Sequence, residues 1–563
     1  MENKKWIQKE IDAQQVEIYK QQYNLSESVA TVLAGRHAQI DNGDILLEKA
    51  GLEAFHDPYL MKDMGKAVER INKAIEAKEK ITIYGDFDCD GVTSTAILYL
   101  YLKSRGANVA FYIPDRIGEG YGVNTAAIDA INEMGTNLII TVDTGITAID
   151  DVNYANSLGL DVIITDHHEP KDEVPSAFAI VDPKQKNCGY PFKHLAGVGV
   201  VFKLIQAFGD GDKKIFDDYV SFVCLGTIAD VAPLVGENRE FVKRGLKAFA
   251  KSKNKGIQAL GRVCNPNNRE VTANMIGFII APRINAAGRL GSAFKSIQMF
   301  LCDDINRAID IAWELVDENI KRQQLEAKIY DEVIDIIEKE RLHEDKIIVI
   351  AQKGWHQGII GIVSSKITER YYKPSILITL DDEGIGKGSG RGIENFNMFD
   401  ALTACNDYLV CFGGHALAAG LTIREENISH LRETINKFAK THLKATDYIP
   451  VINIDCKLAP KDLSFDFLNE LKILEPFGKD NPQPIFLLKT AKISRLGTMA
   501  EKKHMRMTLD FGNAKLDAVM FGKGFMADSF RAGDGVNCVG TLGINEYGGN
   551  KQLQFLIKDI RKC

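Results

Sequence analysis

Aspartate and histidine residues gather in four short segments of this chain of 563 residues, at 81–90, 138–143, 162–168 and 226–230. In the first three, an apolar and largely β-branched run stops where the polar residues begin, and we expect all four segments to lie at strand ends. The carboxyl ends of strands in an open parallel sheet share one edge, where a ligand crevice forms. Side chains far apart in the chain can therefore converge there, which predicts one dinuclear metal site.

The first segment carries Asp86, Asp88 and Asp90 at alternate positions. If the chain stays extended past Gly85, their carboxylates point to one side and repel one another unless a cation neutralises them. Carboxylates with an imidazole suit Mn²⁺ or Mg²⁺, and the lack of cysteine ligands disfavours a structural zinc. Any single aspartate here is as often a helix N-cap, but capping does not explain the whole set. The other candidates are Asp143, Asp166, His167, His168 and Asp230.

The region around these segments alternates between strand and helix patterns. Strands are expected at 81–84, 109–113, 138–142 and 162–165, and helices at 93–103, 125–134 and 148–157. Repeated strand–helix units predict an α/β fold with a doubly wound parallel sheet.

The rest of the chain suggests further parts. Residues 1–70 are expected to form helical and loop pieces, and 291–344 a long helical connector between two domains. A second, smaller α/β domain is expected at 345–450, with a glycine-rich loop at 384–392 and a turn at 413–415. Short β-rich runs in 451–563 predict a small barrel of the OB type. The first α/β domain would then span 71–290.

Composition limits the class of protein. Apolar residues make up 45% of the chain, but no apolar stretch approaches a membrane span and the N-terminus lacks the hydrophobic region of a signal peptide. Ten cysteines without metal spacing fit a reducing compartment, so we expect a cytoplasmic protein with no membrane partner. A net charge of −7 argues against coating nucleic acid by bulk charge, although local basic surfaces can still hold a strand.

An ordered set of motifs resembles the DHH phosphoesterase superfamily and, within it, the RecJ family of single-strand-specific 5′ exonucleases. The resemblance covers nearly the whole chain. The motifs are YGDFDCDGVTSTA (84–96), PDRIGEGYG (114–122), TVDTGI (141–146), DHH (166–168), AGVGVVFKL (196–204), GTIADVAPL (226–234), PRINAAGRL (282–290), GWHQGIIGIV (354–363), GSGR (388–391), GGHALAAG (413–420) and EPFGKDNPQPIF (475–486).

The resemblance implies a role for each residue of the predicted metal site. One metal ion would be held by Asp90, Asp143, His167 and Asp230. The other would be held by Asp86, Asp88 and Asp143, so that Asp143 bridges the two. His168 would lie beside the scissile phosphate, and Asp143, Asp166 and His168 are the predicted catalytic residues. Two such ions stabilise the attacking and leaving oxygens of an in-line displacement at phosphorus.

Substrate contacts are predicted from residue types that recognise phosphate and bases. A terminal phosphate requires guanidinium and hydroxyl donors, and the resemblance places the GSGR loop over the metal site. Tyr121 would stack on a base, and Arg283 and Arg289 would neutralise backbone phosphates. The predicted ligands of the terminal phosphate are Arg116, Ser389, Arg391 and His415.

These observations predict a 5′→3′ exonuclease that hydrolyses single-stranded DNA to 5′-mononucleotides by two-metal-ion chemistry. The resemblance implies roles in recombination and repair. A barrel often carries partner contacts, so a single-strand-binding protein and a helicase are the expected partners. The sequence has no coiled-coil or symmetric-interface signal, which favours a monomer. The main alternative is a DHH phosphoesterase acting on short oligonucleotides or cyclic dinucleotides, although the long helix and the barrel argue against it. A DNA-binding protein that does not cut and a pyrophosphatase are weaker alternatives, because the metal ligands are intact and the barrel would lack a purpose.

Overall fold

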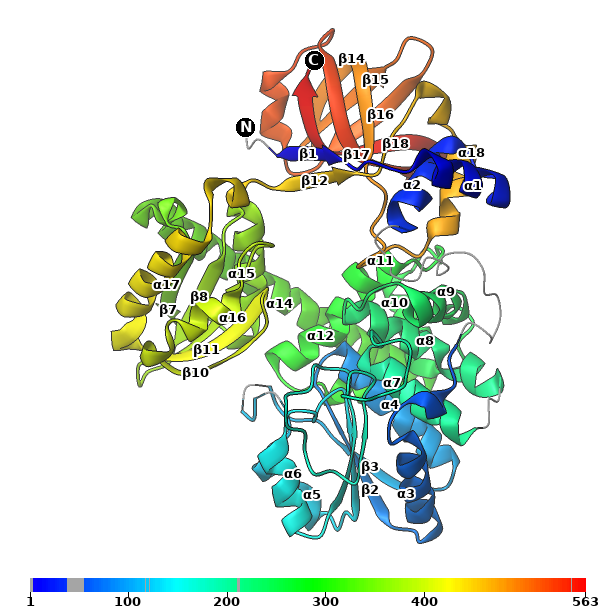
Figure 1. The fold of residues 1–563 in the computed structure, drawn as a ribbon, viewed down its shortest axis with the longest axis vertical. Helices are drawn as coiled ribbons and strands as arrows, with labels where there is room; N and C mark the ends of the chain where they lie inside the picture. Colours follow the sequence, from blue (N-terminus) through cyan, green and yellow to red (C-terminus); the bar gives the residue numbers. More distant parts are fainter. Residues whose placement is uncertain (1–3, 38–54, 117, 121, 210–212, 548) are drawn as a thin grey trace. The chain divides into compact units, whose positions relative to one another are not determined.

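The computed structural model describes residues 4–37, 55–116, 118–120, 122–209, 213–547 and 549–563 (Figure 1). The chain divides into two compact units. We call Leu52–Tyr448 the two-sheet unit, and Met1–Gly51 with Ile449–Cys563 the barrel unit. The finer domain boundaries expected from the sequence stay a prediction. Across the described ranges, every helix is too short or too polar to cross a membrane.

The two-sheet unit contains a parallel sheet in the order β3-β2-β4-β5-β6. Its strands are β2 (Lys80–Gly85), β3 (Asn108–Tyr112), β4 (Leu138–Val142), β5 (Asp161–Thr165) and β6 (Ala179–Val181). Helices α3 (Met64–Glu76), α4 (Cys89–Ser104), α5 (Thr125–Glu133) and α6 (Ile149–Ser157) alternate with them. The predicted strands and helices of this region are therefore confirmed, with small shifts at their ends.

Both faces of this sheet are covered (Figure 1). Along β4, Leu138 and Ile140 join the core with α4 and α7 (Gly197–Phe208), whereas Ile139 joins the core with α5 and α6. A strand buried on both faces needs an unbroken apolar run, which is why these segments show no polar alternation. The doubly wound fold class is confirmed.

The segment 226–230 does not follow a strand, so that expectation was wrong. It forms the C-terminal end of α8 (Lys213–Ala229), a helix that packs on α4, α7 and α9 (Gly236–Phe249). A short apolar run in a buried helix cannot be told from a buried strand by periodicity. The helices that follow are α10 (Lys255–Cys264), α11 (Ala273–Met275), the π-helix η4 (Ile276–Ile280), α12 (Ala281–Leu290) and α13 (Phe294–Leu301).

The predicted long helix is confirmed as α14 (Ile305–Glu340). Ile311 and Leu315 near its start are buried in the core of the first α/β domain. Val333 and Ile337 near its end are buried with residues of β7 (Ile348–Lys353) and α15 (Gln357–Tyr371). The helix therefore contributes to two hydrophobic cores as well as connecting them.

The second sheet has the order β10-β11-β9-β8-β7. Its other strands are β8 (Ser375–Leu380), β9 (Ile385–Arg391), β10 (Leu409–Gly414) and β11 (Ala418–Arg424), with helices α16 (Met398–Thr403) and α17 (Ile428–His442). The GSGR segment was expected to be a loop, but it lies in β9, paired with β8 and β11. A Cβ on Gly388 would lie 2.7 Å from Cδ1 of Leu421, so glycine here allows close packing of one strand face.

The barrel unit confirms the predicted barrel. Its strands follow the order β14-β15-β16-β18-β17, and pairing of β14 with β17 closes it. They are β14 (Phe486–Met499), β15 (His504–Asp510), β16 (Lys515–Met520), β17 (Gly535–Tyr547) and β18 (Asn550–Lys562), preceded by β12 (Val451–Ile454), β13 (Cys456–Lys457) and α18 (Phe465–Leu471).

The N-terminal residues belong to the same unit. Strand β1 (Lys5–Gln8) pairs in parallel with β12, and helices α1 (Ala13–Tyr23) and α2 (Glu27–His37) bury Tyr19, Val29 and Leu33 in the barrel core. The strand was missed by the expectation of helical and loop pieces. Its partner strand begins only at Val451, so no local pattern predicts the pairing.

Candidate metal centre

The first aspartates of the site lie in the turn from β2 to α4. The chain does not stay extended past Gly85 as expected, because α4 already begins at Cys89. Asp88 is the N-cap of α4, and its carboxylate accepts hydrogen bonds from the N–H groups of Asp90 (2.8 Å) and Gly91 (3.1 Å). The capping and metal-binding interpretations of this aspartate are thus compatible, because a carboxylate has lone pairs for both.

The predicted ligands converge in two groups. In each group, one ligand atom per residue lies within 4.8 Å of the others. The groups are Asp86, Asp88 and Asp143, and Asp90, His167 and Asp230. Nδ1 of His167 lies 4.0 Å from Oδ2 of Asp230, so the end of a helix supplies a candidate ligand beside the sheet edge.

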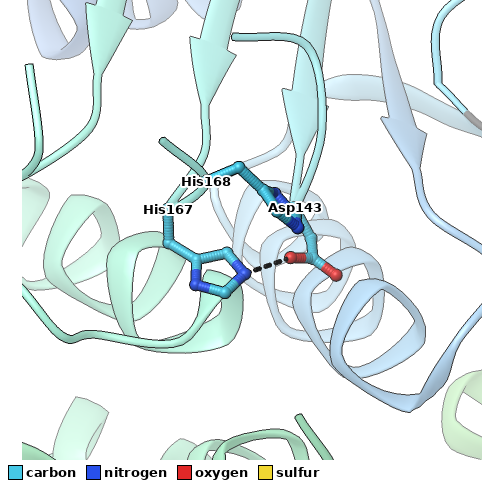
Figure 2. Close-up of side chains that lie close together, drawn as sticks. All are labelled: Asp143, His167 and His168. Atoms are coloured by element: carbon cyan, nitrogen blue, oxygen red, sulfur yellow. Dashed lines mark ion pairs between the residues drawn. The ribbon is translucent and has the colours of Figure 1, made fainter. Parts of the chain in front are cut away.

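Asp143 connects the two groups. Figure 2 shows the ring of His167 directed at its carboxylate, with Nε2 3.0 Å from Oδ1. Both atoms are buried, and in the described part of the chain neither has a hydrogen-bond partner. Oxygen and imidazole nitrogen ligands left without protein partners fit a divalent cation of the Mn²⁺ or Mg²⁺ type.

The electrostatics of the site require positive charge. Burial and the neighbouring carboxylates raise the pKa of Asp86 and of Asp143 well above the ordinary value. Burial and the charge of Asp230 raise the pKa of Asp90 to about 7. Carboxylates held together in this way become ligands when a cation replaces their protons.

The backbone at this site is strained. Asp143 has φ 61° and Val231, which follows Asp230, has φ 57°. The left-handed region is uncommon for residues other than glycine, and for β-branched valine it is rare. Strained residues of this kind cluster at functional sites, where the surrounding structure holds them in place.

Helix α7 approaches the site end-on. The N–H groups of Gly197 and Val198 donate to the carboxylate of Asp90 at 2.7 and 2.8 Å, which suits the positive end of a helix. A Cβ on Gly197 would lie 2.5 Å from Oδ1 of Asp143. A Cβ on Gly226 would lie 2.8 Å from Oδ1 of Asp90. Glycine at both positions leaves room for the carboxylates.

Asp166 lies outside both ligand groups and instead holds the neighbouring histidines. Its buried carboxylate accepts from the N–H groups of Ile146, His167 and His168. Burial raises its pKa, but the hydrogen bond and charge of His168 outweigh this and lower the pKa to about 2. Asp166 is therefore ionised at neutral pH, at the base of the DHH turn.

His168 is oriented by that anion. Its Nδ1 lies 2.7 Å from Oδ1 of Asp166, and its side chain is 36% exposed. Burial lowers its pKa, but the hydrogen bond and charge of Asp166 raise it to about 9. His168 also forms a third candidate ligand group with Asp143 and His167. Its position allows a charged imidazolium to meet an anionic substrate.

Predicted phosphate contacts gather beside the first ligand group. Arg116 lies over the ring of Phe87 at 4.8 Å, and the charges of Asp86 and Asp88 act on it. Burial and the charges of Arg116, Arg322 and Arg391 lower the pKa of Arg289 to about 10, although the charge of Asp88 opposes this. Several guanidinium groups are therefore close enough to repel one another next to Asp88.

The residues from the second sheet are held in place. Arg391 donates through Nη1 to Oγ of Ser389 (2.9 Å) and through Nε to Oγ of Ser365 (3.0 Å). Nη1 of Arg289 donates to the carbonyl oxygen of Gly358 (3.2 Å), linking α12 to α15. Together these contacts fix the guanidinium groups of Arg289 and Arg391.

Three residues that interact with Arg116, Arg289 or Arg391 were not predicted from the sequence: His356, Arg322 and Ser365. Burial, and after it the nearby charge of Arg116, lower the pKa of His356. It stands in the GWHQGIIGIV motif, which was a usable signal. Arg322 lies in a helix rich in charges and Ser365 in an apolar helix, and neither has a distinguishing local pattern.

Other predicted contacts are not brought to this cluster by the interactions observed. The guanidinium of Arg283 donates to the carbonyl oxygen of Ile279 in the preceding turn, and its charge acts on Cys264. His415 is exposed in the β10–β11 turn, where its N–H donates to Ala418. Tyr121 lies outside the described residues. Their substrate contacts stay predictions.

Comparisons with known proteins identify the family and its domains. The DHH family, N-terminal domain, matches residues 80–227, the DHHA1 domain matches 344–441 and the RecJ OB domain matches 454–559. The single-stranded-DNA-specific exonuclease RecJ of Bacillus subtilis is 40% identical over 557 residues, which cover 99% of this chain and 70% of that protein. Escherichia coli RecJ is 33% identical over 518 residues, which cover 88% of this chain and 89% of that protein.

Solved structures are similar over most of the chain. The structure of Thermus thermophilus RecJ in complex with Mn²⁺ has a TM-score of 0.85 at 28% identity, covering 99% of this chain and 80% of that one. A structure of exonuclease RecJ bound to manganese has a TM-score of 0.61 at 32% identity, covering 70% and 100%. The family expected from the motifs is confirmed: this chain belongs to the RecJ family of single-stranded-DNA-specific exonucleases.

Proposed function

We propose that this protein is a metal-dependent 5′→3′ exonuclease that hydrolyses single-stranded DNA to 5′-mononucleotides. The observation that carries the proposal is the position of Asp88, which belongs to one ligand group and whose charge also acts on Arg116 and Arg289. The carboxylates that would bind metal ions thus lie next to the arginines that would bind phosphate. A terminal phosphate held by the arginines would leave the first phosphodiester bond near the metal ligands.

The residues fit two Mn²⁺ or Mg²⁺ ions, the cations named for similar RecJ structures. Asp90, His167 and Asp230 would hold one ion, Asp86 and Asp88 the other, and Asp143 would serve both. When bound, the ions activate water and stabilise the attacking and leaving oxygens, so no covalent protein nucleophile is needed.

The remaining residues would bind and orient the strand. Imidazolium His168, kept charged by Asp166, would donate a hydrogen bond to an oxygen of the scissile phosphate. Arg391 and Ser389 would bind the terminal phosphate, because a guanidinium and a hydroxyl suit its oxygens. Recognition of the end rather than of the sequence would make the enzyme an exonuclease.

The test is product analysis over time with Mn²⁺ and long single-stranded DNA labelled at the 5′ or the 3′ end. The proposal expects immediate release of labelled mononucleotide from the 5′ end only. A blunt duplex and the Asp143→Ala variant should be inert. Hydrolysis limited to di- to tetranucleotides would instead support a small-substrate phosphoesterase, and release from the 3′ end would contradict the polarity.

Partners and location are further proposals. A helicase could supply single strands and a single-strand-binding protein could present them, which fits an enzyme that acts on single strands in recombination and repair. A monomer in the cytoplasm is the simplest state for this role. Sedimentation of the purified protein, with and without a single-strand-binding protein, tests both the monomer and the complex.

A further inference from the structure

An unusual helix turn displays an aromatic side chain to solvent. Among the described residues, Phe278 has the largest exposed fraction of any large apolar side chain, 81%. It lies in the π-helix η4, just before Pro282 in α12. Proline has no N–H to donate, so the regular helix ladder is interrupted there, and the guanidinium of Arg283 donates to the carbonyl of Ile279. Turns of this kind are frequent at functional sites.

This turn packs against the metal-binding end of α8. A Cβ on Gly277 would lie 3.4 Å from Cγ2 of Ile228, and Ile228 precedes the ligand Asp230 by two residues. The π-helix therefore lies next to the segment that carries the ligand. Phe278 is the next residue along that helix.

A second exposed apolar side chain adjoins the same ligand. Val231 directly follows Asp230, is 61% exposed and has φ 57°. It occupies the position after the end of α8 that glycine usually takes, where the N–H of Ala232 donates to Thr227 at 3.2 Å. Glycine would relieve the strain, so an apolar side chain is displayed here at a cost in stability.

We propose that Phe278 and Val231 form an apolar step on which one nucleobase of the substrate strand stacks beside the metal centre. The inference rests on the proposed exonuclease function and adds a base-binding subsite to it. A nucleobase is the occupant we assign because both residues belong to the segments beside Asp230: Val231 directly follows it, and the turn that carries Phe278 packs on Ile228. A strand cleaved at the metal centre must run past these segments. Arg283, one turn from Phe278, offers a cation to the attached phosphate.

The step also provides a reason for single-strand specificity. Stacking on an aromatic ring needs a free base face, and the bases inside a duplex have both faces covered by their neighbours. Because every base has such a face, the contact tolerates any sequence. The enzyme would then select unpaired strands of any sequence through this contact.

The test is a binding cycle between protein and DNA. Full-length protein in EDTA, which prevents cleavage, is titrated with 5′-phosphorylated single strands in which one base at a time is removed to leave an abasic site. Wild-type protein should lose about 5- to 150-fold in affinity at one position near the 5′ end. Phe278→Ala should bind the intact strand correspondingly less well and show no further loss at that position, whereas Phe278→Trp should keep the wild-type profile.

A matched control is Phe178→Ala. Phe178 is 47% exposed and precedes β6, so it lies at the amino edge of the sheet, opposite the metal centre. Its removal should leave every affinity unchanged. A further variant, Val231→Gly, should melt at a higher temperature than wild type yet bind the intact strand more weakly.

Several results would overturn the stacking step. One is a Phe278→Ala protein that binds all strands as wild type does. Another is a loss of equal size at every abasic position, which would indicate an effect independent of bases. A change in melting temperature or hydrodynamic radius of DNA-free Phe278→Ala would show that Phe278 contacts protein, within the chain or in a second copy, and not a nucleobase. Wild-type protein that shows the position-specific loss in EDTA but cleaves nothing with Mn²⁺ would contradict the proposed function and leave the stacking step supported.

Discussion

Nε2 of His167 lies 3.0 Å from Oδ1 of Asp143, and in the described residues neither buried atom has a hydrogen-bond partner. The register of the sheet brings the pair together, because β4 and β5 are parallel neighbours with Val142 opposite Thr165. Asp143 therefore ends one strand where Asp166 and His167 follow the other. Two ligand atoms left to each other in this way are best satisfied by a cation between or beside them.

Replacing Asp143 by asparagine should separate metal binding from folding. The Asp143→Asn substitution removes an acidic group whose ionisation is opposed by burial and by the neighbouring carboxylates, so the metal-free variant should melt at a higher temperature than metal-free wild type. Excess Mn²⁺ at about 100 times its Kd stabilises a binding protein by about 2.7 kcal/mol, and the variant should lose most of this gain. Melting curves with EDTA and with Mn²⁺ measure both effects.

The control for that experiment is Asp150→Asn, at an exposed position in the first turn of α6. It should keep the full stabilisation by Mn²⁺ and the wild-type rate. Asp143→Asn should lose more than about 100-fold in activity, because even residues that only support a metal ligand contribute 10- to 100-fold. An Asp143→Asn protein that still gains the full stabilisation would contradict a shared role for this carboxylate.

Stability without metal should fall as pH rises. The pKa of Asp90 rises from 3.8 to about 7 on folding, so between these values the folded protein binds more protons than the unfolded one. The pKa of His168 rises from 6.5 to about 9 on folding, so the loss of stability continues at higher pH. In EDTA the melting temperature should therefore increase from about pH 8 to about pH 5.5.

Mn²⁺ should remove or reverse this slope, since cation binding releases protons from the ligands and strengthens with pH. In EDTA, Asp90→Asn should have a flatter slope than wild type. If the stability of metal-free wild type instead rises as the pH is raised from about 5.5 to about 8, these carboxylates are not held protonated.

Gly197→Ala should displace the carboxylate of Asp143. The added Cβ would lie 2.5 Å from Oδ1 of Asp143, while the N–H of residue 197 is held by Asp90. Overpacking of this kind costs about 1–3 kcal/mol. We expect Mn²⁺ affinity, measured by titration calorimetry, to drop at least about 10-fold. This is the smaller of the losses in metal affinity that follow when a residue supporting a metal ligand is replaced.

The matched variant is Gly261→Ala in helix α10, where an added Cβ meets nothing within 4 Å. Alanine is the better helix former by about 1 kcal/mol, so this protein should be slightly more stable and bind Mn²⁺ normally. Equal Mn²⁺ affinity in both variants would rule out the spatial argument for Gly197.

His168→Gln should lower the rate without abolishing Mn²⁺ binding. Glutamine keeps a hydrogen-bonding group beside Asp166 but cannot carry the positive charge. Loss of a positioned acid group costs about 100- to 10,000-fold in rate. Calorimetry should still find two Mn²⁺ sites. A lost site would place His168 among the ligands, as the third ligand group allows.

Arg391→Lys should weaken recognition of the 5′ phosphate. Lysine keeps the charge but cannot reproduce the guanidinium geometry that spans Ser389 and Ser365. Loss of a charge-assisted hydrogen bond corresponds to roughly 10- to 150-fold in affinity. The KM should rise for 5′-phosphorylated strands and change little for 5′-hydroxyl strands. An equal rise for both would indicate general phosphate-backbone binding.

Several features could be predicted because their signals are local. The strands at 81–84, 138–142 and 162–165 were predictable, since burial on both faces demands an unbroken apolar run. Asp143 and His167 lie just past strand ends as expected, whereas their role as metal ligands stays a prediction. The closed barrel was also predictable, because short β-rich runs with turns between them mark each strand.

Other features had no local signal. Asp230 follows a helix and not a strand. The element could not be predicted because the run GTIA is equally apolar in a buried helix and in a buried strand. The GSGR segment is a strand whose glycines alternate with Lys387, Ser389 and Arg391, a period-two pattern masked by the usual association of glycine with loops. The exposure of Phe278 depends on which surfaces the neighbouring helices cover.

The sequence by itself determined which side chains are available as ligands and which runs must be buried, because residue chemistry and apolar periodicity are properties of neighbouring residues. Only the tertiary structure decided that Asp143 meets His167 without another partner, that Arg322 and His356 join Arg289 and Arg116, and that β1 pairs with β12. Those relationships join residues far apart in the chain, so their distances depend on strand register and helix packing that no local pattern encodes.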